Sequence, residues 1–549
     1  MIRNKIIEEL KRITGANDIQ LSFPEREEHG DFTTNVALVA AKDKGKNPRE
    51  YAHELVKSIS QVDSLMQIIS EIKIEGPGFI NFYLKEKYLV KILESIDESY
   101  GKTTSNVGQK VMFEYGQPNT HKLPHIGHLF SYVYGEAMTR ILEATGWKVM
   151  RVNYQGDIGP HVAKALWALQ KRKPVIPNSA YEKAKLLQRM YQEGSKAYDD
   201  GESAKAEIDD LNKKIYAHNE EVFALWQETR GWSLDYYQEF EKRLGINYDK
   251  YYFESQVGEE GKKKVKKHTP GIFKESEGAI IFEGSKYGLH DRVFVTKFDT
   301  PTYEAKDYYL EQKKFEDWPC DLVIITTANE QNEYFKVVFK ALEKTHPGYV
   351  GKLKHIGFGM INLKSGKMSS RTGNIISGAE LVDVVITDVA KLGNNNETSE
   401  MVGIGAIKYS FLKNNPLQNT AFDIQESISI EGNSGPYIQY TFARTQSVLA
   451  KSNLQGETLK VNNLEVEELS VVKYLIRFPE VVANAAQNYS PNLVANYLFE
   501  LAQKYNTFYN KHKIIGGEKE QFRLLLTAAT GQVLKNGLEL LGIEAPKKM

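Results

Sequence analysis

The chain has 549 residues, of which 41% are hydrophobic and 26% are charged, and its formal net charge is +0 at pH 7. The length is too great for one hydrophobic core and predicts about three or four domains. The composition is that of a soluble globular protein, and no apolar run approaches the ~20 residues that a membrane span needs. Because the charges balance, any contact with nucleic acid must come from local basic patches.

The cysteine content and the first residues bear on the compartment. The single cysteine, Cys320, excludes an internal disulfide and a cysteine-rich zinc module. Residues 1–10 have the pattern of an amphipathic helix that contains acidic side chains, so we expect no secretory or transit signal. We therefore expect a cytoplasmic protein that does not bind membranes.

Residues 1 to about 105 are predicted to form a small α+β domain. Apolar periodicity predicts helices at 2–13 and 47–59, and alternation predicts strands at 18–23 and 71–75. Two glycine-containing segments, at 29–35 and 76–82, are turns on this interpretation. We expect Phe79 and Phe82 to be core residues.

A strand at 110–115, a loop broken by Gly116 and Pro118, and a helix from about 129 to 144 follow. The loop ends in His125-Ile126-Gly127-His128. The start of a helix can hold a phosphate through backbone N–H groups and the helix dipole, and Gly127 lets a flat ring approach the backbone. By itself this pattern is equally compatible with a loop that merely contains histidines.

The next segments predict a parallel sheet and a long helical region. A strand at 148–154 ends at a turn, Gly156-Asp157-Ile158-Gly159, and the strand–helix–strand spacing is that of a βαβ unit. Residues 163–245 are helical by pattern. The run at 261–268 is the densest basic stretch, and it is either a solvated helix face or a contact to nucleic acid.

The second half of the nucleotide-binding fold is predicted to return near Gly278. Strand-like runs lie at 279–282, 293–298 and 322–326, and a helix opens at 328 with Gln331 near its start. Tyr303 and Asp307 are four residues apart and share a face if helical. Beyond about residue 388 the whole pattern is helical.

Residues 364–374 form a second glycine-bounded loop that carries cations and hydroxyl groups. Two cations, two serines and flanking glycines suit a loop that neutralises a polyphosphate, although an ordinary basic turn has the same composition. The residues concerned are Lys367, Met368, Ser369, Ser370 and Arg371.

Taken together and in this order, the loops at 125–128 and 367–371 resemble the HIGH and KMSKS signatures of class I aminoacyl-tRNA synthetases. Their surroundings, Glu114-x-x-x-Pro118-Asn119 and residues 359–363, are similar to arginyl-tRNA synthetases in particular. Further segments resemble the N-terminal appended domain and the helical anticodon-binding domain of that family, at 29–35, 76–82, 434–444 and 540–546.

The resemblance implies an α/β fold class: a Rossmann-like catalytic domain with a connective insertion, an α+β N-terminal appended domain and an all-α anticodon-binding domain. The appended tRNA-binding domain is expected at 1–105 and the first catalytic half at 106–162. The mostly helical insertion follows at 163–275, the second catalytic half at 276–387 and the anticodon-binding domain at 388–549.

The implied activity is that of an arginine–tRNA ligase. Arginine is activated with ATP to arginyl-adenylate and pyrophosphate, and the arginyl group then passes to the 3′ end of tRNA(Arg). The implied partners are tRNA(Arg), whose elbow the N-terminal domain contacts, L-arginine, and ATP with Mg²⁺. We expect no metal ligands in the protein itself, and a monomer.

The resemblance also implies roles for individual residues. The catalytic residues are His125, His128, Lys122 and Lys367. The ATP-binding residues are His125, Gly127, His128, Met360, Lys367, Met368, Ser369, Ser370 and Arg371. The arginine-binding residues are Glu114, Asn119, Glu254, Tyr303, Asp307 and Gln331.

The sequence departs from the family pattern at several positions. Ser370 stands where KMSKS has its second lysine, and many arginyl-tRNA synthetases that lack this lysine carry one just before the HIGH sequence. Lys122 occupies that place, so we expect it to supply the missing charge. Gln117 stands where a serine is common, which puts a side-chain contact from 117 in doubt. Pro160-His161 replaces threonine–glutamine, so no contact is assigned to them.

Two alternatives remain open from the sequence. The chain is compatible with a class I ligase for another amino acid, which charging with a panel of amino acids would identify. It is also compatible with a catalytically silent paralogue that only binds RNA, although the presence of His125, His128 and Lys367 argues against this.

Overall fold

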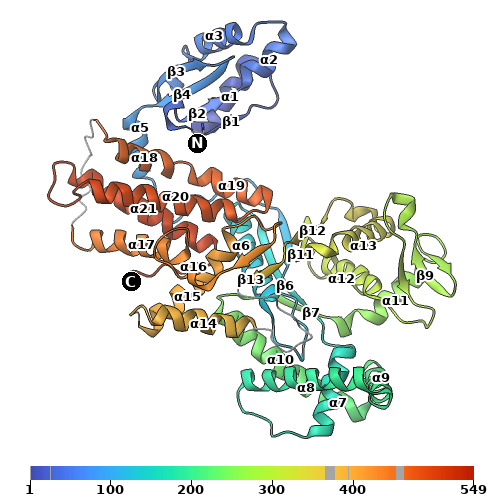
Figure 1. Cartoon of the computed structure of the whole chain (residues 1–549). Coiled ribbons are helices and arrows are strands. Elements are labelled where there is room, and N and C mark those ends of the chain that lie inside the picture. The colour runs from blue at the N-terminus through green and yellow to red at the C-terminus, as the bar shows by residue number, and fades with distance from the viewer. Residues whose placement is uncertain (1, 25, 365–376, 394, 453–462) are drawn as a thin grey trace.

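The computed structural model describes residues 2–24, 26–364, 377–393, 395–452 and 463–549 (Figure 1). At its centre is a five-stranded sheet in the order β12-β11-β5-β6-β7, and all neighbouring strands are parallel. The strands are β5 (Lys110–Glu114), β6 (Lys148–Gln155), β7 (Lys250–Phe253), β11 (Leu322–Ala328) and β12 (Leu353–Phe358). Because the carboxyl ends of parallel strands meet at one edge, the loops after β5, β6 and β11 converge there.

Helices cover the sheet and join its strands. Helix α6 (Ile126–Ala144) connects β5 to β6, while α12 (Tyr303–Asp317) and α13 (Asn332–Thr345) flank β11. Most of α6 is buried, because the sheet lies on one side and C-terminal helices on the other. A helix that is apolar around most of its circumference is stable only in such a position.

A helical insertion separates β6 from β7 and lies at the bottom of Figure 1. Its helices are α7 (Pro160–Arg172), α8 (Ala180–Asp200), α9 (Glu202–Tyr216) and α10 (Glu220–Arg243). They agree with the helical pattern predicted for 163–245. Strand β7 lies within the range that we assigned to the insertion, yet it pairs with β6 in the parallel sheet.

A separate antiparallel sheet, β10-β9-β8, lies beyond α11 (Gly258–Lys267) and α12. Its strands are β8 (Lys274–Ser276), β9 (Ala279–Phe282) and β10 (Arg292–Val295). Two of the strand-like runs that we assigned to the second half of the nucleotide-binding fold are in this sheet, and only the run at 322–326 joins the central one. The segment between β9 and β10 is shorter than the crossover of about a dozen residues that a parallel pair needs.

The N-terminal region forms a four-stranded sheet, β1-β2-β4-β3, packed against helices. Its elements are α1 (Ile2–Thr14), β1 (Leu21–Ser22), η1 (Glu27–His29), β2 (Phe32–Thr34), α2 (Val36–Lys44), α3 (Pro48–Ile59), α4 (Asp63–Met66), β3 (Ile69–Glu75), β4 (Phe79–Leu84) and α5 (Glu86–Leu93). Phe82 is fully buried, as predicted, but Phe79 is 40% exposed. Phe79 begins β4 directly after a turn, at the end of the sheet, so the prediction for Phe79 was wrong.

The C-terminal region consists of α14 (Gly378–Ala390), α15 (Asn396–Leu412), α16 (Ile424–Ser427), α17 (Gly435–Leu449), α18 (Val466–Leu475), α19 (Phe478–Asn488), α20 (Asn492–Lys511) and α21 (Glu520–Leu540). The expectation that everything after residue 388 is helical was wrong at one place. Strand β14 (Thr420–Phe422) pairs in parallel with β13 (Ile361–Leu363), which supplies it with a hydrogen-bonding partner. Four short segments, η2 (Glu254–Gln256), η3 (Gly284–Tyr287), η4 (Asn329–Gln331) and η5 (Pro347–Tyr349), complete the described elements.

Polar contacts hold the C-terminal helices against the rest of the chain. The buried Lys408 Nζ donates to the carbonyl oxygen of Leu244, at the end of α10, at 2.7 Å, and to that of Gly542 at 2.5 Å. Arg243 pairs with Glu400 at 2.7 Å. On the other side, Lys473 of α18 pairs with Asp31 of the N-terminal domain at 3.0 Å. None of the described helices is long and apolar enough to cross a membrane.

The close approach of α6 to β5 generates a prediction about Gly135. A Cβ atom at Gly135 would lie 2.1 Å from Tyr115 Cγ, so Gly135→Ala should destabilise the protein by about 1–3 kcal/mol in urea denaturation. The control is Gly231→Ala in α10, where a Cβ meets nothing within 4 Å and should stabilise by up to about 1 kcal/mol. Equal stability of the two variants would contradict the packing argument.

Candidate active site

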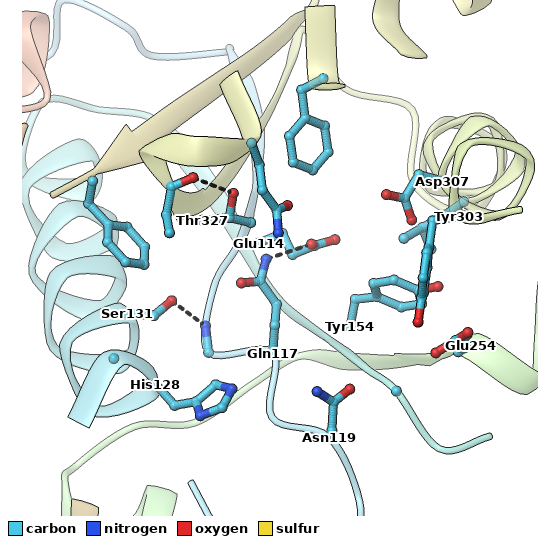
Figure 2. Close-up of a pocket in the computed structure, with 18 of the residues that line it drawn as sticks. Glu114, Gln117, Asn119, His128, Ser131, Tyr154, Glu254, Tyr303, Asp307 and Thr327 are labelled. Atoms are coloured by element: carbon cyan, nitrogen blue, oxygen red, sulfur yellow. Dashed lines mark hydrogen bonds between the residues drawn. The ribbon is translucent and has the colours of Figure 1, made fainter. Parts of the chain in front are cut away.

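A cavity of about 350 Å³ opens at the carboxyl edge of the parallel sheet (Figure 2). All six residues predicted to bind the amino-acid substrate line it, together with His125, Gly127 and His128. The lining residues are Glu114, Gly116, Gln117, Asn119, His125, Gly127, His128, Ser131, Tyr154, Gly156, Glu254, Tyr303, Asp307, Leu310, Glu311, Thr327, Ala328, Gln331, Phe335 and Phe358. Residues separated by more than two hundred positions in the sequence therefore share one cavity.

The loop after β5 is held in a backbone conformation that few side chains tolerate. Gly116 has φ of +92° and Gln117 has φ of +55°. The Gly116 N–H donates to Ser131 Oγ at 2.9 Å, and the Gln117 N–H donates to Asn153 Oδ1 at 3.0 Å. The Gln117 side chain donates to Glu114 Oε1 at 2.7 Å. Gln117 therefore makes a side-chain contact within the protein, because its long amide spans the distance to the carboxylate of Glu114.

Helix α10 fixes the rest of this loop. The buried His121 donates its backbone N–H to Ser233 Oγ at 2.9 Å, and its ring Nε2 lies 2.9 Å from Thr229 Oγ1. The Tyr237 hydroxyl lies 2.7 Å from the carbonyl oxygens of both Asn119 and Lys122. These anchors were not predicted, because they join the loop to residues more than a hundred positions later.

His125 and His128 lie at the first turn of α6 with ring centroids 3.9 Å apart. His125 Nδ1 accepts from the Gly127 N–H at 3.0 Å, and His128 Nδ1 accepts from the His125 N–H at 3.2 Å. The surrounding protein removes water from both imidazole rings, and Lys122 adds a positive charge nearby. Together these effects lower the pKa of His125 to about 4 and that of His128 well below its ordinary value. Both rings are therefore neutral near pH 7 and carry their proton on Nε2, which can donate to an anionic ligand.

The turn after β6 brings the loop and the opposite wall together. A Cβ atom at Gly156 would lie 2.1 Å from Asn119 Oδ1 and 3.2 Å from Glu254 Oε2, so only glycine fits there. The buried Asp157 accepts from the Ser255 N–H at 2.8 Å and pairs with Arg230 at 2.7 Å. His161 Nε2 lies 3.4 Å from the carbonyl oxygen of Gly156, a contact that we had not assigned.

Helix α12 forms the wall opposite the histidines. Tyr303, Asp307 and Glu311 follow one another at four-residue intervals and therefore lie on one face. The Tyr334 hydroxyl donates to Asp307 Oδ2 at 2.6 Å. Burial, with a further contribution from the nearby Glu114, raises the pKa of Asp307 to about 7. Figure 2 shows Asp307, Tyr303, Tyr154 and Glu254 along this side of the cavity.

The cavity wall contains more carboxylates than lysines can neutralise. Glu254 pairs with Lys306 at 2.5 Å, and Lys314 pairs with both Glu114 and Glu311 at 2.5 Å. Asp307 has no lysine within ion-pair distance among the described residues. Burial raises the pKa of Asp307 to about 7 and also raises that of Glu311, so two uncompensated negative charges are present only when both carboxyl groups are ionised. Such a site favours a ligand that carries two positive charges.

Several lining residues were missed by the sequence analysis, notably Tyr154, Gln117, Glu311, Thr327 and Phe335. Glu311 had a usable signal, because it lies one helical turn after Asp307. The others carry no motif of their own. The Tyr154 hydroxyl is buried without a hydrogen-bond partner among the described residues.

Of the other predicted site residues, five fall outside the described residues, and Met360 and Lys122 do not line the cavity. Lys367, Met368, Ser369, Ser370 and Arg371 fall in 365–376, outside the described residues. Met360 is 55% exposed and does not contribute to the cavity. Lys122 Nζ lies 4.2 Å above the centroid of the Tyr191 ring in α8, close enough to the histidines to lower their pKa values.

Comparison with known proteins connects this geometry to a family. Residues 89–424 match the model described as "tRNA synthetases class I (R), catalytic domain". Residues 1–84 match "Arginyl tRNA synthetase N terminal domain", and residues 438–549 match "DALR anticodon binding domain".

Individual relatives agree over the whole chain. An arginine–tRNA ligase from Parabacteroides distasonis is 30% identical, with 100% of this chain and 99% of the relative covered. Another from Fusobacterium nucleatum is 32% identical, with 97% and 95% covered. The solved arginyl-tRNA synthetase of Thermus thermophilus is similar in fold, with a TM-score of 0.87, 23% identity and both chains covered fully.

The hydrogen bonds at the start of α6 predict the state of both histidines. Because each Nδ1 accepts a backbone N–H, we expect ¹⁵N NMR of the imidazoles to show the Nε2–H tautomer for His125 and His128. Both rings should remain neutral between pH 8 and pH 6, since their pKa values are lowered. Titration of either ring with a midpoint near 6.5 would refute this assignment.

Proposed function

The chain belongs to the arginyl-tRNA synthetases, the class I ligases that join arginine to its tRNA, and on this basis we propose how its residues divide that work. The chain is an arginine–tRNA ligase that uses ATP. The observation that carries the proposal for the site is that the six predicted arginine-binding residues lie together in one cavity, whose four carboxylates have only two lysines as ion-pair partners among the described residues.

Arginine fits this cavity by charge and by shape. Its guanidinium is planar, permanently charged and offers five N–H donors, so carboxylates bind it best. We assign the guanidinium to Asp307, Tyr303, Gln331 and Glu254, and the amino-acid end to Glu114 and Asn119. Since Glu254 shares its charge with Lys306, Asp307 supplies the larger part of the attraction.

ATP is assigned to the opposite side, at the start of α6. The carboxylate of arginine attacks the α-phosphate and pyrophosphate leaves, so the enzyme needs neither a nucleophile nor a strong base of its own. His125 and His128 are assigned to donate their Nε2–H groups to phosphate oxygens, which stabilises the charge of the transition state. Gly127 leaves room for the His125 ring, since a Cβ atom there would lie 2.9 Å from His125 Cε1, and we assign it to the close approach of the nucleotide.

Further contacts to ATP are assigned to Met360, Lys367, Met368, Ser369, Ser370 and Arg371, all but the first of which lie outside the described residues. Within the described ranges, no group of three or more His, Cys, Asp and Glu side chains could hold a metal ion. We therefore propose that Mg²⁺ arrives on the phosphates of ATP, and none of the protein contacts above depends on it.

The remaining assignments concern tRNA(Arg) and the form of the enzyme. We propose that the N-terminal domain contacts the tRNA elbow, that the helical C-terminal domain binds the anticodon, and that the enzyme is a cytoplasmic monomer. The divisions at residues 105, 162, 275 and 387 are proposed likewise. In the basic run, Lys262 and Lys263 pair with acidic neighbours at 2.9 and 2.6 Å, which favours the solvated helix face over a tRNA contact.

The raised pKa of Asp307 predicts how arginine binding depends on pH. Arginine binds the ionised carboxylate, so affinity is lost as the pH falls through about 7. The KM for arginine, measured by charging with tRNA(Arg) present, should rise about tenfold from pH 8 to pH 6. The KM for ATP is the control and should change little.

Asp307→Asn should raise the KM for arginine and flatten its dependence on pH. A KM for arginine that is independent of pH in the unmodified enzyme, or an equal slope in the Asn variant, would contradict the role of Asp307.

The position of Lys122 near the histidines predicts a specific defect in activation. Lys122→Ala removes a cation from the phosphate side, so ATP–pyrophosphate exchange with tRNA present should fall by about tenfold or more. The matched control is Lys185→Ala. Lys185 Nζ lies 5.2 Å over the ring of Tyr181, and both residues are in α8, so this variant also removes a lysine stacked on a tyrosine of α8 and should leave exchange unchanged. Normal exchange in the Lys122 variant would mean that the missing KMSKS lysine is not replaced from this position.

A further inference from the structure

Glu311 is a buried carboxylate that the assignments above do not use. It lies on α12 one turn beyond Asp307, on the face that also carries Tyr303. Its side chain lines the cavity, and the residue is only 1% exposed. The row of cavity-facing side chains on α12 thus continues past the residue that we assign to the guanidinium.

The two oxygens of Glu311 are in different situations. Oε1 accepts from Lys314 Nζ at 2.5 Å. Oε2 is buried and meets no hydrogen-bond donor in the part of the chain that the structure describes. Lys314 cannot serve both oxygens well, because its ammonium is also held by Glu114 Oε2 at 2.5 Å. A buried acceptor without a donor is costly and uncommon, so the free oxygen indicates a group that enters with a ligand.

The chemistry of that group follows from the surroundings. Asp307, four residues away on the same face, can accept from one edge of a guanidinium, which leaves further N–H donors to be satisfied. The opposite end of arginine is assigned to Glu114, the last residue of β5, and to Asn119 in the loop after it. Lys314 joins Glu311 to Glu114, whereas Glu311 shares its face of α12 with Asp307 and Tyr303, and on that shared face we assign the free oxygen to the guanidinium.

We propose that Glu311 is a further specificity-determining residue, whose Oε2 accepts a guanidinium N–H of arginine beside Asp307. The inference rests on the proposed assignment of the cavity to arginine. Lys314 holds the other oxygen of Glu311, and the residue lines the cavity. A lysine substrate carries a compact ammonium in place of the planar guanidinium with its five donors, so it cannot reproduce the same geometry at the two carboxylates, and such a mismatch discriminates between substrates.

The test substitutes Glu311 while keeping its bond to Lys314. In Glu311→Gln the amide oxygen can still accept from Lys314, and the NH₂ group, a donor, then faces the cavity. We expect the KM for arginine to rise roughly 10–100-fold, the range for a lost hydrogen bond to a charged group, with the KM for ATP unchanged. Glu311→Asp keeps the charge but withdraws it by one methylene, and we expect a smaller rise.

A probe without the α-amino group identifies the end of the substrate that Glu311 contacts. The inhibition constant of 5-guanidinopentanoic acid should rise by the same factor as the KM for arginine in Glu311→Gln. If only the KM for arginine rises, Glu311 contacts the α-ammonium and the proposal is overturned. It is also overturned if neither constant changes.

The matched control is Glu316→Gln on the same helix. Glu316 is a partly exposed residue that accepts from Gln312 at 2.7 Å and does not line the cavity, so both constants should stay within about twofold of the unmodified enzyme. An effect of Glu316→Gln as large as that of Glu311→Gln would overturn the proposal. Failure of the unmodified enzyme to charge arginine would instead refute the assignment of the cavity, so the two failures can be told apart.

Discussion

The site depends on an incomplete neutralisation of buried charge. Isolated carboxylates are too costly to bury in an ionised form, and two lysines reduce that cost at Glu254, Glu114 and Glu311. A third lysine would weaken the attraction for a cationic substrate, whereas fewer lysines would favour protonation of the carboxylates. The pKa of Asp307, raised to about 7, shows that the cavity is already close to this second limit. Charge selection and proton uptake are thus two results of the same burial.

The side of the cavity at the start of α6, to which we assign the phosphates, is formed, within the described residues, by neutral groups and not by charged ones. His125 and His128 are kept neutral, and their orientation is set by backbone N–H groups and not by acidic side chains. Neutral donors with a fixed tautomer can bind phosphate without attracting the carboxylates of the facing wall. The cavity therefore separates a region that attracts cations from a region that offers hydrogen bonds, and a substrate with a cationic end and a reacting carboxylate is oriented by that contrast.

Local patterns in the sequence predicted much of this arrangement. The strand–loop–helix at 110–144, the four-residue spacing of Tyr303 and Asp307, and the parallel βαβ unit depend on neighbouring residues, and the structure contains them. Local patterns could not show which strands pair with one another or which side chains the rest of the fold covers. They did not place β7 in the central sheet or β9 and β10 outside it, and they did not show that Phe79 lies at an uncovered end of its sheet. The spacing of Glu311 from Asp307 was a usable signal, but only the structure shows its ion pair with Lys314 and its place in the cavity wall.

Helix α10 has a mechanical consequence for the enzyme. Its 24 residues make a rod of about 36 Å. The loop that precedes the histidines is hydrogen-bonded by three side chains of α10, those of Thr229, Ser233 and Tyr237. The carboxyl end of α10 contacts α15 through Lys408 and Arg243. Because a helix is stiff along its axis, a displacement of one end of α10 is transmitted to the other end. Chimaeras that exchange the C-terminal helices between relatives must therefore preserve the contacts between α15 and the end of α10. Otherwise a change made far from the loop that precedes the histidines will displace that loop.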